Sequence, residues 1–300
     1  MPISHLLLAL LVVVVWGINF LFVSLGLQEI SPLLLCALRF LLASIPAIFF
    51  IKFPRGSFKI IASYGIVMFA LQFGFLFIGM SFGMPAGIAS ILIQVQVFFS
   101  MLFAVFFLGE QPNIGQVAGA LVSFMGIGLV ALHFDNDISL AGFIFILAAA
   151  ATWGLGNLIT KKVKGNQGSN MVALIAWGSF VACIPMLFLS LLIEGGANFI
   201  STFEHITWKG VGSLFYIVFV STWVGYGVWN WLMARYPVGM VAPFTLLVPV
   251  VAMLSSVIFL GETFQLWKLV AGLLVISGLC INILGSRYLT IRVRAEAEVI

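Results

Sequence analysis

The amino-acid sequence predicts an all-α integral membrane protein with ten transmembrane helices in two inverted five-helix repeats. Three observations predict this fold class. The chain is 63% hydrophobic and only 7% charged, whereas a soluble domain has about 25% charged residues. Its apolar residues form ten separate runs. Finally, segments 84–110 and 236–262 align without a gap and share nine identical positions, including a closing Phe-Leu-Gly-Glu.

The composition excludes a soluble protein, because too few polar side chains are present to cover a surface that faces water. Residues 60–109 form a run of 50 positions without one charged side chain. This length is enough for two helical crossings of about 20 residues each. The first apolar run, 6–27, has no lysine or arginine before it. We therefore expect it to be a retained helix and not a cleaved signal.

Polar or turn-forming residues separate the ten apolar runs. Each run must be a helix, because lipid offers no hydrogen-bond partner to an exposed backbone. The expected helices cover residues 4–27, 31–51, 59–80, 85–109, 114–133, 138–160, 170–193, 210–233, 238–260 and 266–286. We expect the chain to divide into a first repeat, a second repeat and a cytoplasmic tail, which cover residues 1–134, 138–288 and 289–300.

Lysine and arginine are distributed unevenly between the two sides of the membrane. If the N-terminus is cytoplasmic, ten of the 13 basic residues lie on or beside that side, and only Lys209 and Lys268 lie outside. Such a bias indicates that both termini are cytoplasmic. Five crossings separate the two copies of the repeat. The copies therefore run in opposite directions, which makes the two halves inverted repeats.

Further motifs recur in the two halves. Val-Trp-Gly with Asn19 resembles Thr-Trp-Gly with Asn157, and a Gly-Glu ends the fourth and ninth runs at Glu110 and Glu262. With these motifs, the segments LLVVVVWGINF, LCALRF, IPAIFF, FGMPAGIAS, AAAATWGLGN and LLVPVV make the whole chain resemble the drug/metabolite transporter superfamily, and within it the EamA family. The resemblance implies a bacterial inner-membrane exporter of small amino acids or metabolites such as cysteine and O-acetylserine, working by alternating access.

Polar and aromatic side chains inside the expected helices are the candidates for a substrate path. Polar groups in lipid are costly unless they face a cavity or one another. The candidates are Trp16, Asn19, Gln72, Gln94, Trp153, Asn157, Thr222, Tyr226 and Asn230. Asn19 and Asn157 occupy similar faces of the first and sixth helices, so we expect them to line one central site. Hydrogen bonding between helices is the alternative role for both.

Spacing refines two of these expectations. Gln94 and Gln96 lie about 200° apart on an α-helix, so we expect one to line the path and the other to pack. Thr222, Tyr226 and Asn230 follow the spacing i, i+4 and i+8. This spacing predicts a polar stripe along one face of the eighth helix.

Other residues are candidates for structural or gating roles. Arg39 is the one charge well inside an expected helix. It is suited to bind a carboxylate, but we expect a mainly structural role, such as bonding carbonyl groups at a broken helix end. Prolines within the fourth and ninth helices are expected to break or kink them. These prolines are Pro85, Pro237, Pro243 and Pro249. Glu110 and Glu262 are expected to couple transport or to cap the following helix.

Other classes of function fit less well. An exporter of cationic drugs is the first alternative, but no aspartate or glutamate lies deep in an expected helix. A membrane scaffold without transport activity is the second. We expect no enzymatic activity, cofactor or metal, because the sequence has no HExxH, P-loop or metal-binding cluster. Nucleic-acid binding is not expected either, since no basic patch with exposed aromatic residues is present. The expected partners are a small-molecule substrate and the lipid bilayer. The oligomeric state is not predicted.

Overall fold

The computed structural model describes residues 1–53, 58–109, 111–133, 138–164, 171–236, 241–263 and 265–297. Over these residues the protein is all-α. Eight helices are long and apolar enough to cross a membrane, and two shorter apolar helices, Phe244–Leu260 and Leu266–Asn282, bring the total in the described part to ten. The prediction of an all-α protein with ten membrane helices is confirmed.

The helices of the first half follow the first five predicted crossings. Two crossings contain a short irregular turn, the π-helical η1 and the 3-10 helical η2. The elements are α1 (Ile3–Gly26), α2 (Pro32–Ser44), α3 (Ala47–Phe50), α4 (Phe58–Tyr64), η1 (Gly65–Leu71), α5 (Gln72–Ser81), α6 (Ala86–Leu92), η2 (Ile93–Val95), α7 (Gln96–Leu108) and α8 (Ile114–Ala131).

The second half repeats this order and adds one helix, α11, between its second and third crossings. The elements are α9 (Leu140–Lys164), α10 (Met171–Leu189), η3 (Ser190–Glu194), α11 (Gly196–His205), α12 (Trp208–Phe215), η4 (Tyr216–Gly225), α13 (Tyr226–Arg235), η5 (Ala242–Leu247), α15 (Val248–Leu260) and α16 (Leu266–Ala297). The turns η3 and η4 are π-helical, and η5 is a 3-10 helix.

The Phe-Leu-Gly-Glu motif of each half is a helix end. Gly109 ends α7 and Gly261 ends α15, both with φ of 67°, in the left-handed region. Residues with a Cβ atom adopt this conformation at a cost, whereas glycine does so freely. The two glycines of the repeat are therefore explained by the same backbone turn.

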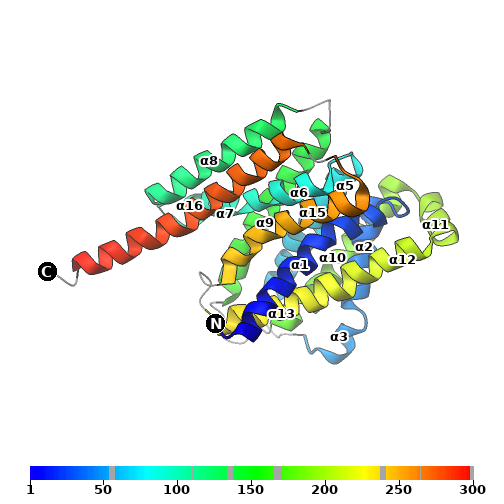
Figure 1. Ribbon diagram of the computed structural model, residues 1–300. Helices are drawn as coiled ribbons and strands as arrows, with labels where there is room; N and C mark the ends of the chain where they lie inside the picture. Colours follow the sequence, from blue (N-terminus) through cyan, green and yellow to red (C-terminus); the bar gives the residue numbers. More distant parts are fainter. Residues whose placement is uncertain are drawn as a thin grey trace.

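The two halves are interleaved. In the main helix pairs α1 packs on α15, α7 and α5 pack on α9, α2 packs on α10, and α8 packs on α16 (Figure 1). Each pair joins one helix of the first half to one of the second. The pattern is preserved when the halves are exchanged, since α1–α15 then becomes α9–α7. Such an exchange is what two inverted repeats produce.

The recurring Trp-Gly motif allows two of these crossings. A methyl group added at Gly17 of α1 would lie 2.6 Å from Val251 Cγ1 of α15. A methyl group added at Gly154 of α9 would lie 2.8 Å from the Ser100 backbone nitrogen of α7. Neither crossing leaves space for a side chain. The motif therefore sets how closely the halves approach each other.

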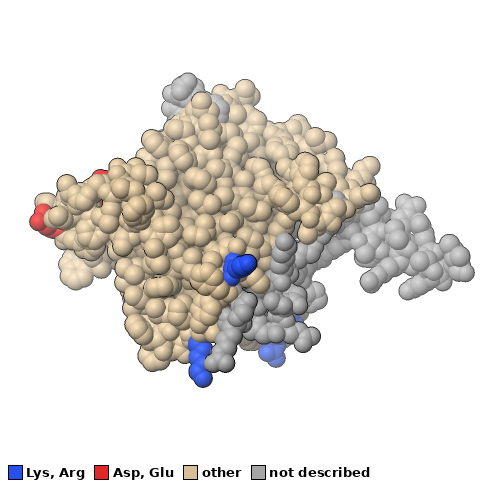
Figure 2. Space-filling view, turned by 180° about the vertical axis from the view of Figure 1, so that it is seen from behind, with Lys and Arg blue, Asp and Glu red and all other residues tan. Residues whose placement is uncertain are grey.

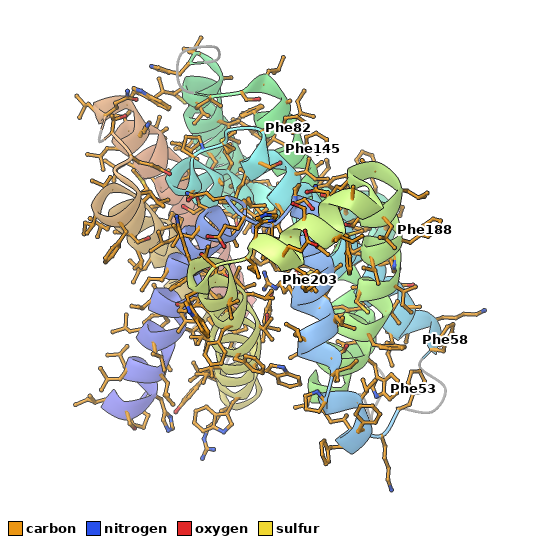
Figure 3. The ribbon with its side chains drawn as sticks, turned by 90° about the vertical axis from the view of Figure 1, so that its right-hand side faces the viewer. Phe53, Phe58, Phe82, Phe145, Phe188 and Phe203 are labelled. Atoms are coloured by element: carbon orange, nitrogen blue, oxygen red, sulfur yellow. The ribbon has the colours of Figure 1, made fainter. Side chains whose placement is uncertain are left out.

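The outer surface of the bundle is apolar. Many large hydrophobic side chains are exposed, among them Phe50 at 83%, Phe106 at 73% and Phe188 at 62%. Figure 3 shows labelled phenylalanines on several sides of the molecule, with Phe53 near Phe58 and Phe82 stacked on Phe145. Water-facing surfaces rarely carry so much apolar area. The exposed rings are the lipid-facing side of a multi-pass membrane protein.

Apart from Arg39 inside α2, the charged side chains of the described part lie towards the two ends of the bundle. Three glutamates, Glu29, Glu194 and Glu262, follow α1, α10 and α15 at what we call the acidic end. Exposed Lys52 and Arg235 lie at the opposite, basic end. On the face seen in Figure 2, acidic side chains lie at the left-hand edge, and basic ones lie apart from them lower on the molecule.

Candidate functional site

A cavity of about 90 Å³ lies in the centre of the bundle between the two halves. Its wall combines aromatic rings with amide, hydroxyl and guanidinium groups. The residues that line it are Trp16, Asn19, Phe20, Arg39, Gln72, Phe73, Leu76, Ile93, Gln94, Gln96, Trp153, Ser221, Tyr226, Thr245 and Val248. Of the predicted path residues, six line this cavity, namely Trp16, Asn19, Gln72, Gln94, Trp153 and Tyr226. Their role in transport stays a prediction.

Two interrupted helices meet at the cavity. The fourth crossing is broken by η2 and the ninth by η5, at positions that correspond in the internal repeat. Gln94 of η2 donates a hydrogen bond from Nε2 to the Thr245 carbonyl oxygen of η5 over 2.9 Å. A 3-10 turn leaves some carbonyl groups free of their usual α-helical partners. The breaks therefore supply backbone acceptors as well as side chains to the cavity wall.

The predicted proline breaks need correction for the fourth crossing, whereas the ninth crossing is broken at η5, which contains Pro243 and is closely followed by Pro249. Pro85 precedes α6 as its N-cap residue and does not kink the helix. Pro249 is buried near the N-terminus of α15, where a missing N–H costs little. Pro243 lies in η5, and its side chain is outside the described residues, as is the whole of Pro237. The break at η2 contains no proline, so proline is not its cause.

Both glutamines of the fourth crossing line the cavity, although we expected only one to do so. Residues 93–95 form a 3-10 turn. In an α-helix the side chains of residues i and i+2 point about 160° apart around the helix axis, whereas in a 3-10 turn they point only about 120° apart. Gln94 and Gln96 therefore both reach the same space.

Trp16 is held in the cavity wall by the second half of the protein. Its indole Nε1 donates a hydrogen bond to the Ser221 carbonyl oxygen over 3.2 Å. Its ring centroid lies 5.2 Å from that of Tyr226 and 5.3 Å from that of Trp229. Asn19 follows on the same helix face and is 6% exposed. These contacts give the cavity an aromatic side next to a carboxamide.

Asn157 does not share the central cavity with Asn19, which corrects the predicted symmetric pair. Its Nδ2 donates to Gln96 Oε1 over 2.7 Å and to Ser100 Oγ over 3.0 Å. It lines a second cavity of about 490 Å³ between α7, α9 and the start of α8. Asn19 lies three residues after Trp16, whereas Asn157 lies four residues after Trp153. The two side chains therefore lie on different faces of their helices.

The polar stripe predicted for the eighth crossing is also displaced. In the π-helical η4 each backbone hydrogen bond joins residues five apart, whereas in an α-helix it joins residues four apart. Thr222 Oγ1 therefore donates to its own helix, to the Ile217 carbonyl oxygen over 2.9 Å, and is absent from the cavity wall. Ser221 and Tyr226 line the cavity instead. The side chain of Asn230 lies outside the described residues.

Arg39 lines the cavity, and the described residues show no hydrogen bond from its Nε or Nη1 to a broken helix end, so its structural role stays a prediction. Its side chain is 1% exposed, on α2, five residues before that helix ends at Ser44. The guanidinium carbon lies 3.9 Å from the ring centroid of Phe73. Its Nε and Nη1 have no hydrogen-bond partner in the described part of the protein.

Unsatisfied polar atoms concentrate at the cavity. Five buried side-chain atoms of the described residues lack a hydrogen-bond partner. Four of them belong to the cavity wall, namely Asn19 Oδ1, Arg39 Nε, Arg39 Nη1 and Gln72 Oε1. The fifth is Ser179 Oγ. Buried polar groups are normally paired, and those that are not need an explanation such as a ligand.

Comparison with known proteins identifies the family of this ten-helix chain. The model of the EamA-like transporter family matches it twice, over residues 3–132 and 140–284. The chain belongs to the EamA-like transporter family. It is therefore a transporter and not an enzyme, as predicted.

Curated relatives of this EamA-like transporter share its length. A probable amino-acid metabolite efflux pump of Salmonella typhimurium is 40% identical over 93% of the chain and 95% of the relative. A protein of the same description from Escherichia coli is 38% identical over 94% of the chain and 95% of the relative. A solved structure described only as a crystal structure of a protein has a TM-score of 0.63, at 17% identity over 96% of this chain and 99% of the other. This last likeness shows the fold alone.

The acidic end of the transporter joins its two halves through three carboxylates, of which the sequence analysis singled out only Glu262. Glu194 of the second half accepts hydrogen bonds at the start of α2 in the first half. The donors are the Leu33 N–H over 2.7 Å, the Leu34 N–H over 3.1 Å and the Ser31 hydroxyl over 2.6 Å. Ser190 donates to the same carboxylate over 2.7 Å. A carboxylate at a helix N-terminus also interacts favourably with the helix dipole.

Glu29 makes a similar connection in the other direction. It belongs to the first half and accepts from Thr207 and Gly210 at the start of α12 in the second half. The Thr207 hydroxyl, which donates to Glu29 Oε1 over 2.6 Å, lowers the pKa of the Glu29 carboxyl from its ordinary value.

Glu262 completes the set of three, which we call the carboxylate caps. Its Oε1 accepts from the Ala86 N–H at the start of α6 over 2.8 Å. It therefore caps a helix of the opposite half, whereas we predicted that it would cap the following helix. Burial raises the pKa of the Glu262 carboxyl, and the Ala86 N–H and nearby Lys268 oppose that effect. Glu110, its counterpart in the repeat, lies outside the described residues.

Proposed function

We propose that this protein exports small amino acids or closely related metabolites, such as cysteine and O-acetylserine, from the cytoplasm by alternating access. The observation that carries the proposal is the central cavity, whose wall is built from both halves and holds unpaired buried polar atoms. Secondary transporters with inverted repeats bind substrate at such an interface. The efflux-pump descriptions of the two curated relatives support the same substrate class.

The size of the cavity supports a small substrate. A volume of about 90 Å³ corresponds to roughly six to nine water-sized positions, close to the about seven non-hydrogen atoms of cysteine. Binding sites commonly enclose most of the surface of their ligand. The volume of the cavity is therefore close to that of an amino acid the size of cysteine.

The charge of the cavity disfavours the alternative of a cationic-drug exporter. Among the described residues that line it, Arg39 is the one charged side chain and no carboxylate is present. A permanent cation placed beside a buried guanidinium would be repelled. Quaternary ammonium compounds are therefore expected to be poor substrates.

The carboxylate caps suggest how access alternates. All three connect the two halves at the acidic end, through Glu29, Glu194 and Glu262. We assign this end to the outside, because the basic end then faces the cytoplasm of a bacterial inner membrane. In this orientation the caps hold the outer ends of α2, α6 and α12 against the opposite half. Release of substrate to the outside then requires these connections to open as the halves move.

A counterflow assay in proteoliposomes tests the function. Vesicles with the purified protein are loaded with unlabelled amino acid, and uptake of labelled cysteine, serine or O-acetylserine is measured with and without a pH gradient. We expect accumulation of at least one of these compounds above protein-free vesicles, and none of a labelled quaternary ammonium compound. A panel of small amino acids that gives no counterflow, or counterflow of the cation alone, would reject the proposed substrate class.

The opposite pKa shifts of two carboxylate caps predict opposite effects of pH on stability. The pKa of Glu262 is raised above its ordinary value of 4.5, so its contribution to stability is present below that pH and is lost as pH rises through the raised pKa. The pKa of Glu29 is lowered, so its contribution is present above 4.5 and is lost as pH falls through the lowered pKa.

Thermal unfolding midpoints of the wild type, Glu262→Gln and Glu29→Gln, measured between about pH 3 and pH 8, check this prediction. As pH rises, the unfolding midpoint of the wild type is expected to fall relative to that of Glu262→Gln. Relative to that of Glu29→Gln, the wild-type midpoint is expected to rise. Curves that stay parallel for all three proteins would show that neither carboxyl has a shifted pKa.

A further inference from the structure

Arg39 is a buried cation without a counter-ion in the described part of the protein. Its side chain is 1% exposed, and no carboxylate of the described residues forms an ion pair with it. Its guanidinium makes cation–π contacts instead. The guanidinium carbon lies 3.9 Å from the ring centroid of Phe73 and 5.5 Å from that of Phe40. A buried charge without a partner destabilises the folded protein. An anionic group that enters the cavity would offset this cost.

The same cavity wall carries acceptors that lack donors. Asn19 Oδ1 and Gln72 Oε1 are buried, and neither has a hydrogen-bond partner among the described residues. Amide oxygens accept hydrogen bonds and suit an ammonium group, which has three N–H donors. The cavity thus presents unused donors on Arg39 and unused acceptors on Asn19 and Gln72.

We propose that the cavity binds its substrate as a zwitterion, with the carboxylate on the Arg39 guanidinium and the ammonium group on Asn19 Oδ1 and Gln72 Oε1. This inference rests on the proposed function, since it specifies how the exported amino acid is recognised. The rings of Trp16 and Tyr226, which lie 5.2 Å apart, bound the space that remains for the side chain of the substrate.

Arginine is better suited to this position than lysine. Its guanidinium is planar, stays charged and stacks on aromatic faces while its N–H groups point outward in the plane. Phe73 provides such a face. The stack fixes the orientation of the donors before the carboxylate arrives, which reduces the entropy lost on binding.

The proposal predicts that both charges of the substrate are required. A methyl ester removes the anion, and an N-acetyl group removes the cation. Each loses charge-assisted hydrogen bonds, which corresponds to about 10- to 100-fold weaker binding. Serine methyl ester is only one carbon atom larger than serine, and N-acetylserine is an isomer of O-acetylserine. An exporter that selects by size alone would therefore accept the ester with serine, and N-acetylserine with O-acetylserine.

Binding to the purified full-length protein tests the inference. The shift of the unfolding midpoint is measured with serine, serine methyl ester and N-acetylserine, and with the corresponding forms of cysteine. The variants are Arg39→Met, which removes the charge, Arg39→Lys, which keeps it, and Arg235→Met as the matched control. Arg235 is an exposed arginine at the basic end. Counterflow of the same compounds is measured in parallel.

We expect only the free amino acids to stabilise the wild type and Arg235→Met. Arg39→Met should lose this response, and Arg39→Lys should retain part of it. Without ligand, Arg39→Met should unfold at the same temperature as the wild type or above it, because a buried unpaired charge has been removed. A structural arginine would give the opposite result, a lower unfolding temperature.

The outcomes separate this inference from the proposed function. Equal binding of ester and free amino acid by the wild type, or normal binding by Arg39→Met, would overturn the inference even if transport is observed. Stabilisation that depends on Arg39 without any counterflow would support the inference and reject the export function. A wild type that binds none of the zwitterions would overturn the inference.

Discussion

Replacement of Gly154 by alanine is expected to destabilise the transporter by about 1–3 kcal/mol, and replacement by leucine to prevent correct assembly of the halves. The added Cβ atom would lie 2.8 Å from both Phe99 Cβ and the Ser100 backbone nitrogen of α7. A backbone atom cannot move aside without displacing its helix. The measurement is the thermal unfolding midpoint of the purified protein together with counterflow activity.

Gly128 provides the matched control. It is a glycine in the interior of α8, and a Cβ atom added there meets nothing within 4 Å. Alanine at an open helical position is favoured over glycine by about 1 kcal/mol. Gly128→Ala is therefore expected to leave stability unchanged or raise it, whereas Gly154→Ala lowers it. If both substitutions act in the same direction, close packing of α9 on α7 does not explain the Trp-Gly motif.

Replacement of Glu194 by alanine is expected to cost about 2–5 kcal/mol of stability. The carboxylate accepts four hydrogen bonds, from Ser31, Leu33, Leu34 and Ser190. Without it, the two backbone N–H groups at the start of α2 lose their partner, and unsatisfied donors are costly. Since these bonds join the two halves at the acidic end, transport is expected to fall along with stability.

Glu204 is the control for this substitution. It lies on α11 at the same end of the molecule, but it is exposed. Glu204→Ala is therefore expected to change stability by less than about 0.5 kcal/mol. Glu194→Gln keeps one acceptor oxygen and should fall between wild type and alanine. Similar unfolding midpoints for Glu194→Ala and Glu204→Ala would show that the hydrogen bonds of Glu194 contribute little.

The fold was predictable because lipid restricts the alternatives. An apolar run of sufficient length must be a helix in the membrane, so the ten runs predicted the ten helices. The internal repeat predicted a related architecture in both halves, and the turn at Gly109 recurs at Gly261 with the same φ of 67°. The interleaved packing of the halves was not predictable, because neither periodicity nor repeat identifies which helices touch.

The candidate site was predictable only in part, and two of the misses share one cause. The positions of the side chains in the fourth and eighth crossings were derived from the spacing of a regular α-helix. The π-helical η4 turned Thr222 away from the cavity and brought Ser221 to it, and the 3-10 turn η2 brought in Gln96. Such local changes of helical pitch depend on tertiary contacts, and no residue type marks them.

The sequence by itself determined that this protein is a helical membrane protein with two inverted halves and polar residues inside its helices. These properties follow from composition, length and charge distribution, which act through the solvent. Only the tertiary structure decided which polar residues meet. It brought Arg39, Asn19 and Gln72 to one cavity, where buried polar atoms of all three lack a hydrogen-bond partner among the described residues. It also set Glu29, Glu194 and Glu262 on helices of the opposite half. The physical reason is that hydrogen bonds and ion pairs depend on distances between segments far apart in the chain.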